Sequence, residues 1–130
     1  MSQKNFKDLM ALVVDDDSIV QLILKKELDT YGIQSVAVSN GVEALETLKK
    51  IKFDFVMMDI SMPEQDGLDT IRWIRDLDDH TRDLPIFAVT SFDTKAHTEE
   101  LLEAGFNGHF PKPIDFPKFI ETLKNYFWKP

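Results

Sequence analysis

The chain has 130 residues, with 15 lysines and arginines against 23 aspartates and glutamates, and a formal charge of −8 at neutral pH. This length suits one domain that can bury a core without cross-links, and we expect a single domain over 1–130 with its core at about 10–128 and a short N-terminal extension. The negative charge opposes phosphate backbones, which argues against direct nucleic-acid binding. The absence of cysteine excludes disulfides and thiolate metal sites.

Hydropathy along the chain argues against a membrane role. No apolar run reaches the ~20 residues that a membrane-spanning helix requires. The opening decapeptide MSQKNFKDLM lacks the apolar core of a signal peptide. Together with the lack of cysteine, these features predict a cytoplasmic protein with no membrane partner.

The chain begins with a strand followed by a helix. The segment ALVVD at 11–15 is short, apolar and β-branched, which predicts a buried strand. Ser18 and Gln21 have the spacing of a capping box, which predicts that a helix begins there. Apolar residues then recur at helical spacing until Gly32, where we expect the helix to end.

Two further strand–helix units follow the first. The segment QSVAVS at 34–39 predicts the second strand, and the helix after it is expected to begin at Asn40 and to carry Val42 on its apolar face. The segment 53–59 predicts a strongly apolar third strand. A third helix is expected after the loop SMPEQDG at 61–67.

The last part of the chain repeats the same alternation. The segment LPIFAVTS at 84–91 predicts a fourth strand, and Thr94 is expected to begin a helix on which Leu102 faces inward. The segment GHFP at 108–111 predicts a brief fifth strand. Asp115 is expected to begin the final helix.

Alternating apolar strands and helices predict an α/β fold. Because the strands are apolar along their whole length, they indicate a parallel sheet covered by helices on both faces, a three-layer α/β/α arrangement with five strands and five helices. In such doubly wound sheets, ligands bind beyond the carboxyl ends of the strands. If the strand order is 2-1-3-4-5, the first and third strands are neighbours about 5 Å apart.

Polar residues stand at the carboxyl ends of four of the five predicted strands. They are Asp15 and Asp16 after the first, Asp59 after the third, Thr90 after the fourth and Lys112 after the fifth. In the order considered above, the three carboxylates would converge, and they cannot all stay ionised unless one takes a proton or a cation binds. Oxygen ligands without histidine or cysteine favour Mg²⁺, with Mn²⁺ as the second candidate.

The chain resembles the receiver domain of two-component response regulators. Five motifs occur in the family's order, namely VVDDD, FVMMDISMPEQDGL, FAVTS, AGFNGHF and PKPID. The resemblance covers nearly the whole chain. It implies a flavodoxin-like (CheY-like) doubly wound fold with the strand order 2-1-3-4-5.

The resemblance also implies a phosphorylation site. Asp59 matches the phosphoacceptor aspartate, and Asp15 and Asp16 match the acidic pair that holds Mg²⁺. The backbone carbonyl of Ile60 matches the family's third protein ligand to the ion, beside Asp59 itself.

Further site residues follow from the same resemblance. Lys112 matches the family's lysine, and Thr90 matches the hydroxyl that moves toward the phosphoryl group. His109 stands where the family usually has a rotating aromatic residue, either as that switch or as a partly exposed surface histidine. Three residues that flank the site are expected to tune the lifetime of the phosphoryl group: Ser61, Ser91 and Phe92.

The implied function is that of a phosphorelay receiver, not of an enzyme with external turnover. A sensor histidine kinase or a phosphotransfer protein would donate the phosphoryl group, and a downstream protein would be the target of a monomer or weak dimer. The alternatives are a scaffold independent of phosphorylation, or a receiver module from a hybrid histidine kinase or multidomain regulator. A haloacid-dehalogenase-type phosphatase is disfavoured, because Ser61 stands where its second acid belongs.

Overall fold

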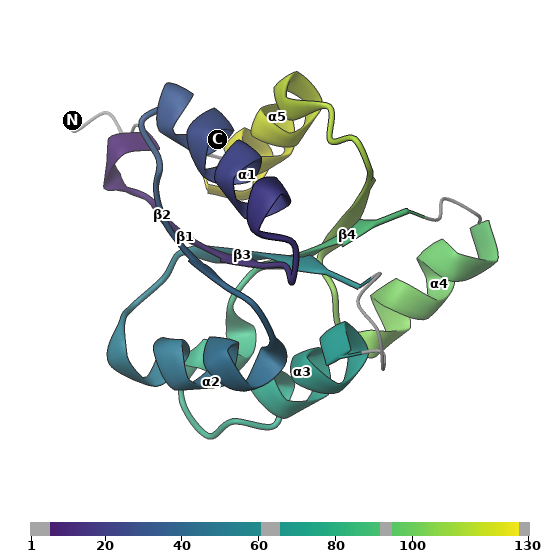
Figure 1. Ribbon diagram of the computed structural model, residues 1–130. Coiled ribbons are helices and arrows are strands. Elements are labelled where there is room, and N and C mark those ends of the chain that lie inside the picture. Colours follow the sequence, from purple (N-terminus) through teal and green to yellow (C-terminus); the bar gives the residue numbers. More distant parts are fainter. Residues whose placement is uncertain (1–5, 61–65, 92–94, 128–130) are drawn as a thin grey trace.

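In the computed structural model, which describes residues 6–60, 66–91 and 95–127, a central sheet separates two layers of helices (Figure 1). Its strands are β1 (Met10–Val14), β2 (Gln34–Val38), β3 (Phe55–Asp59), β4 (Ile86–Thr90) and β5 (Gly108–Pro111). Its helices are α1 (Ser18–Thr30), α2 (Gly41–Lys50), α3 (Asp66–Arg75), α4 (Lys95–Ala104) and α5 (Phe116–Phe127), with short 3-10 turns η1 (Phe6–Asp8) and η3 (His80–Asp83).

The sheet has the order β2-β1-β3-β4-β5, and every pair of neighbours is parallel. This is the flavodoxin-like order, so the predicted α/β fold and strand order are confirmed. The chain moves outward from β1 to β2 and then crosses back to β3 on the other side of β1. The carboxyl ends of β1 and β3 therefore lie side by side at the point where the winding reverses.

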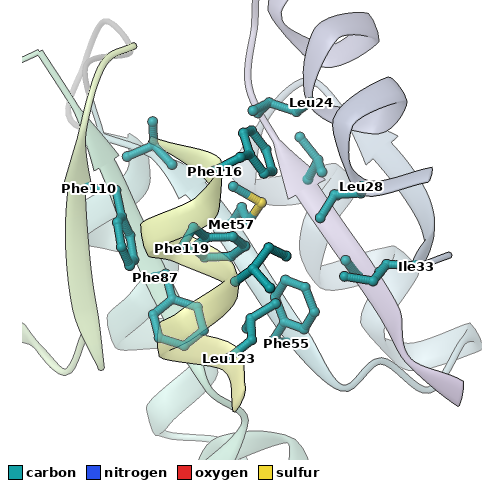
Figure 2. Packing of buried hydrophobic residues seen from close by; sticks show 14 of the residues in the cluster. Leu24, Leu28, Ile33, Phe55, Met57, Phe87, Phe110, Phe116, Phe119 and Leu123 are labelled. Carbon is teal, nitrogen blue, oxygen red and sulfur yellow. The ribbon is translucent and has the colours of Figure 1, made fainter. Parts of the chain in front are cut away.

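Each face of the sheet has its own hydrophobic core. On the face covered by α1 and α5 the core is rich in phenylalanine, and Figure 2 shows Phe119 of α5 among Phe87 and Phe110 from the strands. The rings of Phe110 and Phe119 meet edge to face with centroids 4.9 Å apart, a favoured aromatic geometry. The opposite core, under α2, α3 and α4, is mainly aliphatic, with Ile71 and Ile74 fully buried.

The start of α1 differs from the predicted capping box. Asp17 is the N-cap, and its carboxylate accepts hydrogen bonds from the main-chain N–H groups of Ile19 and Val20. Ser18 is the first helical residue, and the Gln21 amide donates to carbonyls at the sheet edge instead of closing a box. The predicted end is confirmed, because Gly32 follows α1 with a φ of 85°, a left-handed conformation suited to glycine.

Several apolar helix residues lie outside the core, contrary to prediction, among them Ile19, Leu22 and Ile23 of α1. Leu102 is 52 % exposed, while its neighbour Leu101 is buried. Val42 is 58 % exposed, because α2 buries the stripe that runs through Gly41 and Ala44. No helix within the described residues has the length and apolar character needed to cross a membrane.

Candidate functional site

Three strands bring charged side chains to the carboxyl edge of the sheet. Asp15 directly follows β1, Asp59 is the last residue of β3, and Lys112 directly follows β5. Both carboxylates are buried, with 1 % of Asp15 and 3 % of Asp59 exposed. The ends of the three strands therefore place these side chains at the same edge of the sheet, where the sequence predicts the polar residues to lie.

A single ammonium group faces both buried carboxylates. The Nζ of Lys112 donates a hydrogen bond to Oδ2 of Asp59 at 3.1 Å and lies 3.6 Å from Oδ2 of Asp15. Partial burial lowers the pKa of Lys112, but the hydrogen bond to Asp59 and the two negative charges outweigh burial and raise that pKa above its usual value. Lys112 is therefore a fixed positive charge at neutral pH.

The carboxylate of Asp15 accepts a hydrogen bond through only one of its two oxygens. The main-chain N–H of Asp17 donates to its Oδ1 at 2.9 Å, whereas its Oδ2 is buried without a hydrogen-bond partner. Burial, together with the negative charge of Asp59, raises the pKa of Asp15 to about 6, against the opposing effects of the Asp17 hydrogen bond and of Lys112. A buried carboxylate oxygen without a donor is costly, and a bound cation would relieve that cost.

The acidic residues fit a divalent cation. One carboxylate oxygen from each of Asp15, Asp16 and Asp59 lies within 4.8 Å of the other two. Asp16 is exposed and lends the cluster an open side, while the other two are buried. Hard oxygen ligands, among them an Asp15 Oδ2 that accepts no hydrogen bond, match the preferences of Mg²⁺, which keeps part of its water shell when it binds to carboxylates.

Two other predicted residues flank this cluster. Thr90 is fully buried at the end of β4 and follows Val89, the register partner of Asp59. Its carbonyl accepts a hydrogen bond of 2.8 Å from the main-chain N–H of Lys112. Ile60 directly follows Asp59 and is tied to Val89 through its N–H at 3.0 Å, so its carbonyl belongs to a backbone held at the edge of the site.

Four predicted site residues remain, and two of them lie within the described part of the chain. Ser91 is exposed after β4, and Ser61 and Phe92 lie outside the described residues. His109 is half-buried on β5, with its Nε2 atom 3.2 Å from Oγ1 of Thr98 on α4. The histidine therefore links the sheet to α4.

Gln21, near the site, has a different role from the capping role that the sequence predicts. Gln21 joins the carbonyls of Asp15 and Val38 at the ends of β1 and β2, an edge where the sequence offered nothing distinctive. Its position was a usable signal, because Gln21 shares a helix face with the buried Leu24 and Leu28 at i+3 and i+7. A glutamine on a sheet-facing stripe needs hydrogen-bond partners there.

Comparisons with known proteins agree with this geometry. Residues 11–124 match the profile of the response regulator receiver domain. A polar-differentiation response regulator, DivK of Brucella anthropi, is 34 % identical over 115 residues, which is 88 % of this chain and 93 % of DivK.

Solved structures have the same fold. The receiver domain of the sensor histidine kinase PA1611 of Pseudomonas aeruginosa, with a magnesium ion coordinated in its active-site cleft, superposes with a TM-score of 0.80 at 26 % identity, covering 91 % of this chain and 96 % of that one. The co-crystal of the Saccharomyces cerevisiae histidine phosphotransfer signaling protein Ypd1 with the receiver domain of Ssk1 gives 0.81 at 23 % identity, covering 95 % and 91 %.

Proposed function

This chain belongs to the response regulator receiver domain family of two-component phosphorelays, and on that premise we propose that Asp59 is its phosphoacceptor. Asp15, Asp16, Asp59 and the backbone carbonyl of Ile60 would hold the Mg²⁺ ion, for which Mn²⁺ is a substitute with the same oxygen ligands. The observation that carries the proposal is one ammonium, that of Lys112, facing two buried carboxylates, one of which has an oxygen that accepts no hydrogen bond.

The reaction is a transfer between two nucleophiles. A carboxylate oxygen of Asp59 attacks the phosphorus of a phosphohistidine; the new P–O bond forms an acyl phosphate, and the P–N bond breaks as the electron pair returns to the imidazole. No general base is required, because the attacking group is a carboxylate. Water later attacks the acyl phosphate, which releases inorganic phosphate and restores Asp59.

Positive charge at the site permits this meeting of anions. When bound, Mg²⁺ neutralises phosphoryl oxygens and aligns the transfer. Lys112 already lies 3.1 Å from Asp59, so its ammonium stands beside the carboxylate that would carry the phosphoryl group. The chain would act as a self-catalysed phosphoacceptor switch and not as an enzyme that turns over an external substrate.

The signal would leave through β4, β5 and α4. Thr90 lies next to Asp59 in the sheet, and its hydroxyl would move to bond the phosphoryl group. His109 lies on the strand paired with β4 and is joined to Thr98 of α4, so a shift of Thr90 would be transmitted to α4 through this pair. Phosphorylation adds about −1.5 to −2 charges at neutral pH, enough to bias such a switch.

The proposed phosphodonor is a sensor histidine kinase or a phosphotransfer protein. Three exposed apolar side chains on α1, those of Ile19, Leu22 and Ile23, follow Asp15 and Asp16 closely in sequence and offer an apolar surface for such a partner. The output would be a downstream protein target of a cytoplasmic monomer or weak dimer.

The proposal is tested with beryllofluoride, an analogue of the phosphoryl group. Amide spectra of the parent should change saturably on addition of beryllofluoride with Mg²⁺, with the largest shifts near Asp59, Thr90 and α4. The change should vanish with a chelator and in Asp59→Asn, while Asp54→Asn, a carboxylate at the opposite edge of the sheet, should respond like the parent. An unaltered response in Asp59→Asn would overturn the assignment and favour a phosphorylation-independent scaffold.

A further inference from the structure

The side-chain amide of Gln21 joins the carboxyl ends of two strands. Its Nε2 donates to the main-chain carbonyl of Asp15 at 2.6 Å and of Val38 at 3.0 Å, and lies 3.4 Å from Oγ of Ser39. Asp15 directly follows β1 and Val38 ends β2. The main-chain N–H of Asp15 also donates to the carbonyl of Val38 at 3.1 Å. The Gln21 amide therefore adds to a backbone hydrogen bond that already joins the ends of the two strands.

The carbonyl that Gln21 binds belongs to the peptide unit between Asp15 and Asp16. A peptide unit is planar, so a hydrogen bond that fixes this carbonyl also fixes the direction in which the chain continues toward Asp16. A second contact acts on the other side of the same residue, where the N–H of Asp17 holds Oδ1 of Asp15. The backbone between the two acidic residues and the carboxylate of the first are therefore both held in the absence of an ion.

We propose that Gln21 is a positioning residue for the Mg²⁺ site, one that orients the peptide between Asp15 and Asp16 before the ion arrives. The inference rests on the proposed function. Asp16 is exposed and its backbone lies beyond the strand, so without the Gln21 contacts it would sample more directions, and binding would have to bear the entropic cost of ordering it. With the contacts, its carboxylate stays in the cluster with Asp15 and Asp59.

A purely structural role makes a different prediction. Gln21 also lies on the sheet-facing stripe of α1 with Leu24 and Leu28, and its hydrogen bonds could serve only to dock the helix. In that case its loss would lower the melting temperature and leave the affinity for Mg²⁺ unchanged. The two roles are therefore separated by an affinity measured at a temperature where both proteins are folded.

The experiment compares Gln21→Met, which keeps the length of the side chain but has no N–H donor, with Gln34→Met. Gln34 is exposed at the start of β2, at the opposite edge of the sheet. Titration calorimetry should show a Mg²⁺ dissociation constant about 10-fold larger for Gln21→Met, the low end of what lost outer-sphere partners cost. Gln34→Met should match the parent.

A second readout uses the protein without Mg²⁺. In Gln21→Met the Asp15 carbonyl carbon and the Asp16 amide should shift, and the Asp16 amide should become more mobile on the picosecond-to-nanosecond scale. At saturating Mg²⁺ the beryllofluoride response should return to within about twofold of the parent, because positioning residues act through the ion. If Gln21→Met folds poorly, Gln21→Asn, which shortens the amide by one methylene, should show the same affinity loss.

The outcomes separate this inference from the proposed function. A parent that gives no Mg²⁺-dependent response would refute the proposed function itself. A parent that responds, with a Gln21→Met variant that binds Mg²⁺ as tightly as the parent, would overturn the positioning role and leave Gln21 as a helix-docking residue.

Discussion

Two aspartates at opposite edges of the sheet have opposite environments. Asp54 precedes β3 and accepts a hydrogen bond of 2.8 Å from the main-chain N–H of Met10, while its own N–H donates to the Met10 carbonyl at 2.8 Å. Asp15, at the other edge, is more deeply buried, and its Oδ2 has no hydrogen-bond partner. The carboxylate of Asp54 is hydrogen-bonded to the neighbouring backbone, whereas one oxygen of the Asp15 carboxylate accepts no hydrogen bond.

The difference shows how a stable sheet accommodates a reactive edge. A buried polar group that is satisfied contributes modestly to stability, whereas one that is unsatisfied costs free energy. Such a cost is retained where it serves binding or chemistry. We therefore expect substitutions at the two aspartates to change stability in opposite directions, and only the substitution at Asp15 to weaken Mg²⁺ binding.

The largest expected effect is on ion binding. Asp15→Asn should weaken Mg²⁺ binding by about 10- to 100-fold, because a charged ligand becomes neutral, and the free energy of unfolding without Mg²⁺ at pH 7 should rise by about 1–3 kcal/mol. Asp54→Ala should lower the free energy of unfolding by about 1–3 kcal/mol with Mg²⁺ affinity unchanged. Calorimetry and urea denaturation check both, and parallel behaviour of the two variants would refute the contrast.

The second expected effect is a pH dependence of ion binding. Because burial raises the pKa of Asp15 to about 6, Mg²⁺ must displace a proton below that pH, and its affinity should fall about tenfold between pH 8 and pH 5. Titration calorimetry in several buffers should also show proton release. An affinity that stays constant down to pH 5 would contradict an Asp15 that titrates near 6.

The same raised pKa has a consequence for stability without Mg²⁺. A carboxyl group whose pKa is higher in the folded state favours folding below its unfolded-state pKa, and this contribution is lost as pH rises through the folded-state value. The difference in unfolding free energy between parent and Asp15→Asn should therefore turn against the parent between about pH 4 and pH 6. A difference that does not vary with pH would contradict this assignment.

The smallest expected effect concerns the contact between α4 and β5, through which the signal is proposed to leave. Thr98→Val removes the hydroxyl that meets His109 at 3.2 Å, while Thr122→Val, at an exposed-face hydroxyl bonded to its own helix, is the control. If the contact between Thr98 and His109 stabilises the position that α4 has without a phosphoryl group, its loss should strengthen beryllofluoride binding. The expected gain in affinity is about two- to tenfold, the equivalent of one net hydrogen bond. Equal affinity in Thr98→Val and the parent would show that the pair does not oppose the switch.

The pattern of apolar and polar residues was sufficient to predict a parallel α/β sheet and to place the charged residues at one edge of it. Apolar strands alternating with helices lead to a parallel sheet, and parallel strands bring all their carboxyl ends to one edge. Asp15, Asp59 and Lys112 each stand at such an end, so their meeting follows once the strand order is known. The order itself came from family resemblance, because periodicity does not distinguish one arrangement of five strands from another.

Side-chain direction was less accessible from the sequence. Leu101 and Leu102 are consecutive and about 100° apart around α4, so only one of them can face the core fully, and apolar character does not say which. Val42 lies beside, not on, the buried stripe of α2. Gln21 has the spacing of a capping box, yet Asp17 caps the helix better because it stands one residue before the first helical turn.

The most direct test of the account is transfer from a phosphohistidine. A histidine-phosphorylated phosphotransfer domain is mixed with the parent or with Asp59→Asn, in Mg²⁺ or in chelator, and intact mass is recorded over time. The parent should gain one phosphoryl group in the presence of Mg²⁺, and neither the parent in chelator nor Asp59→Asn should gain one. A gain that persists in Asp59→Asn, or that is equally fast in chelator, would contradict the account.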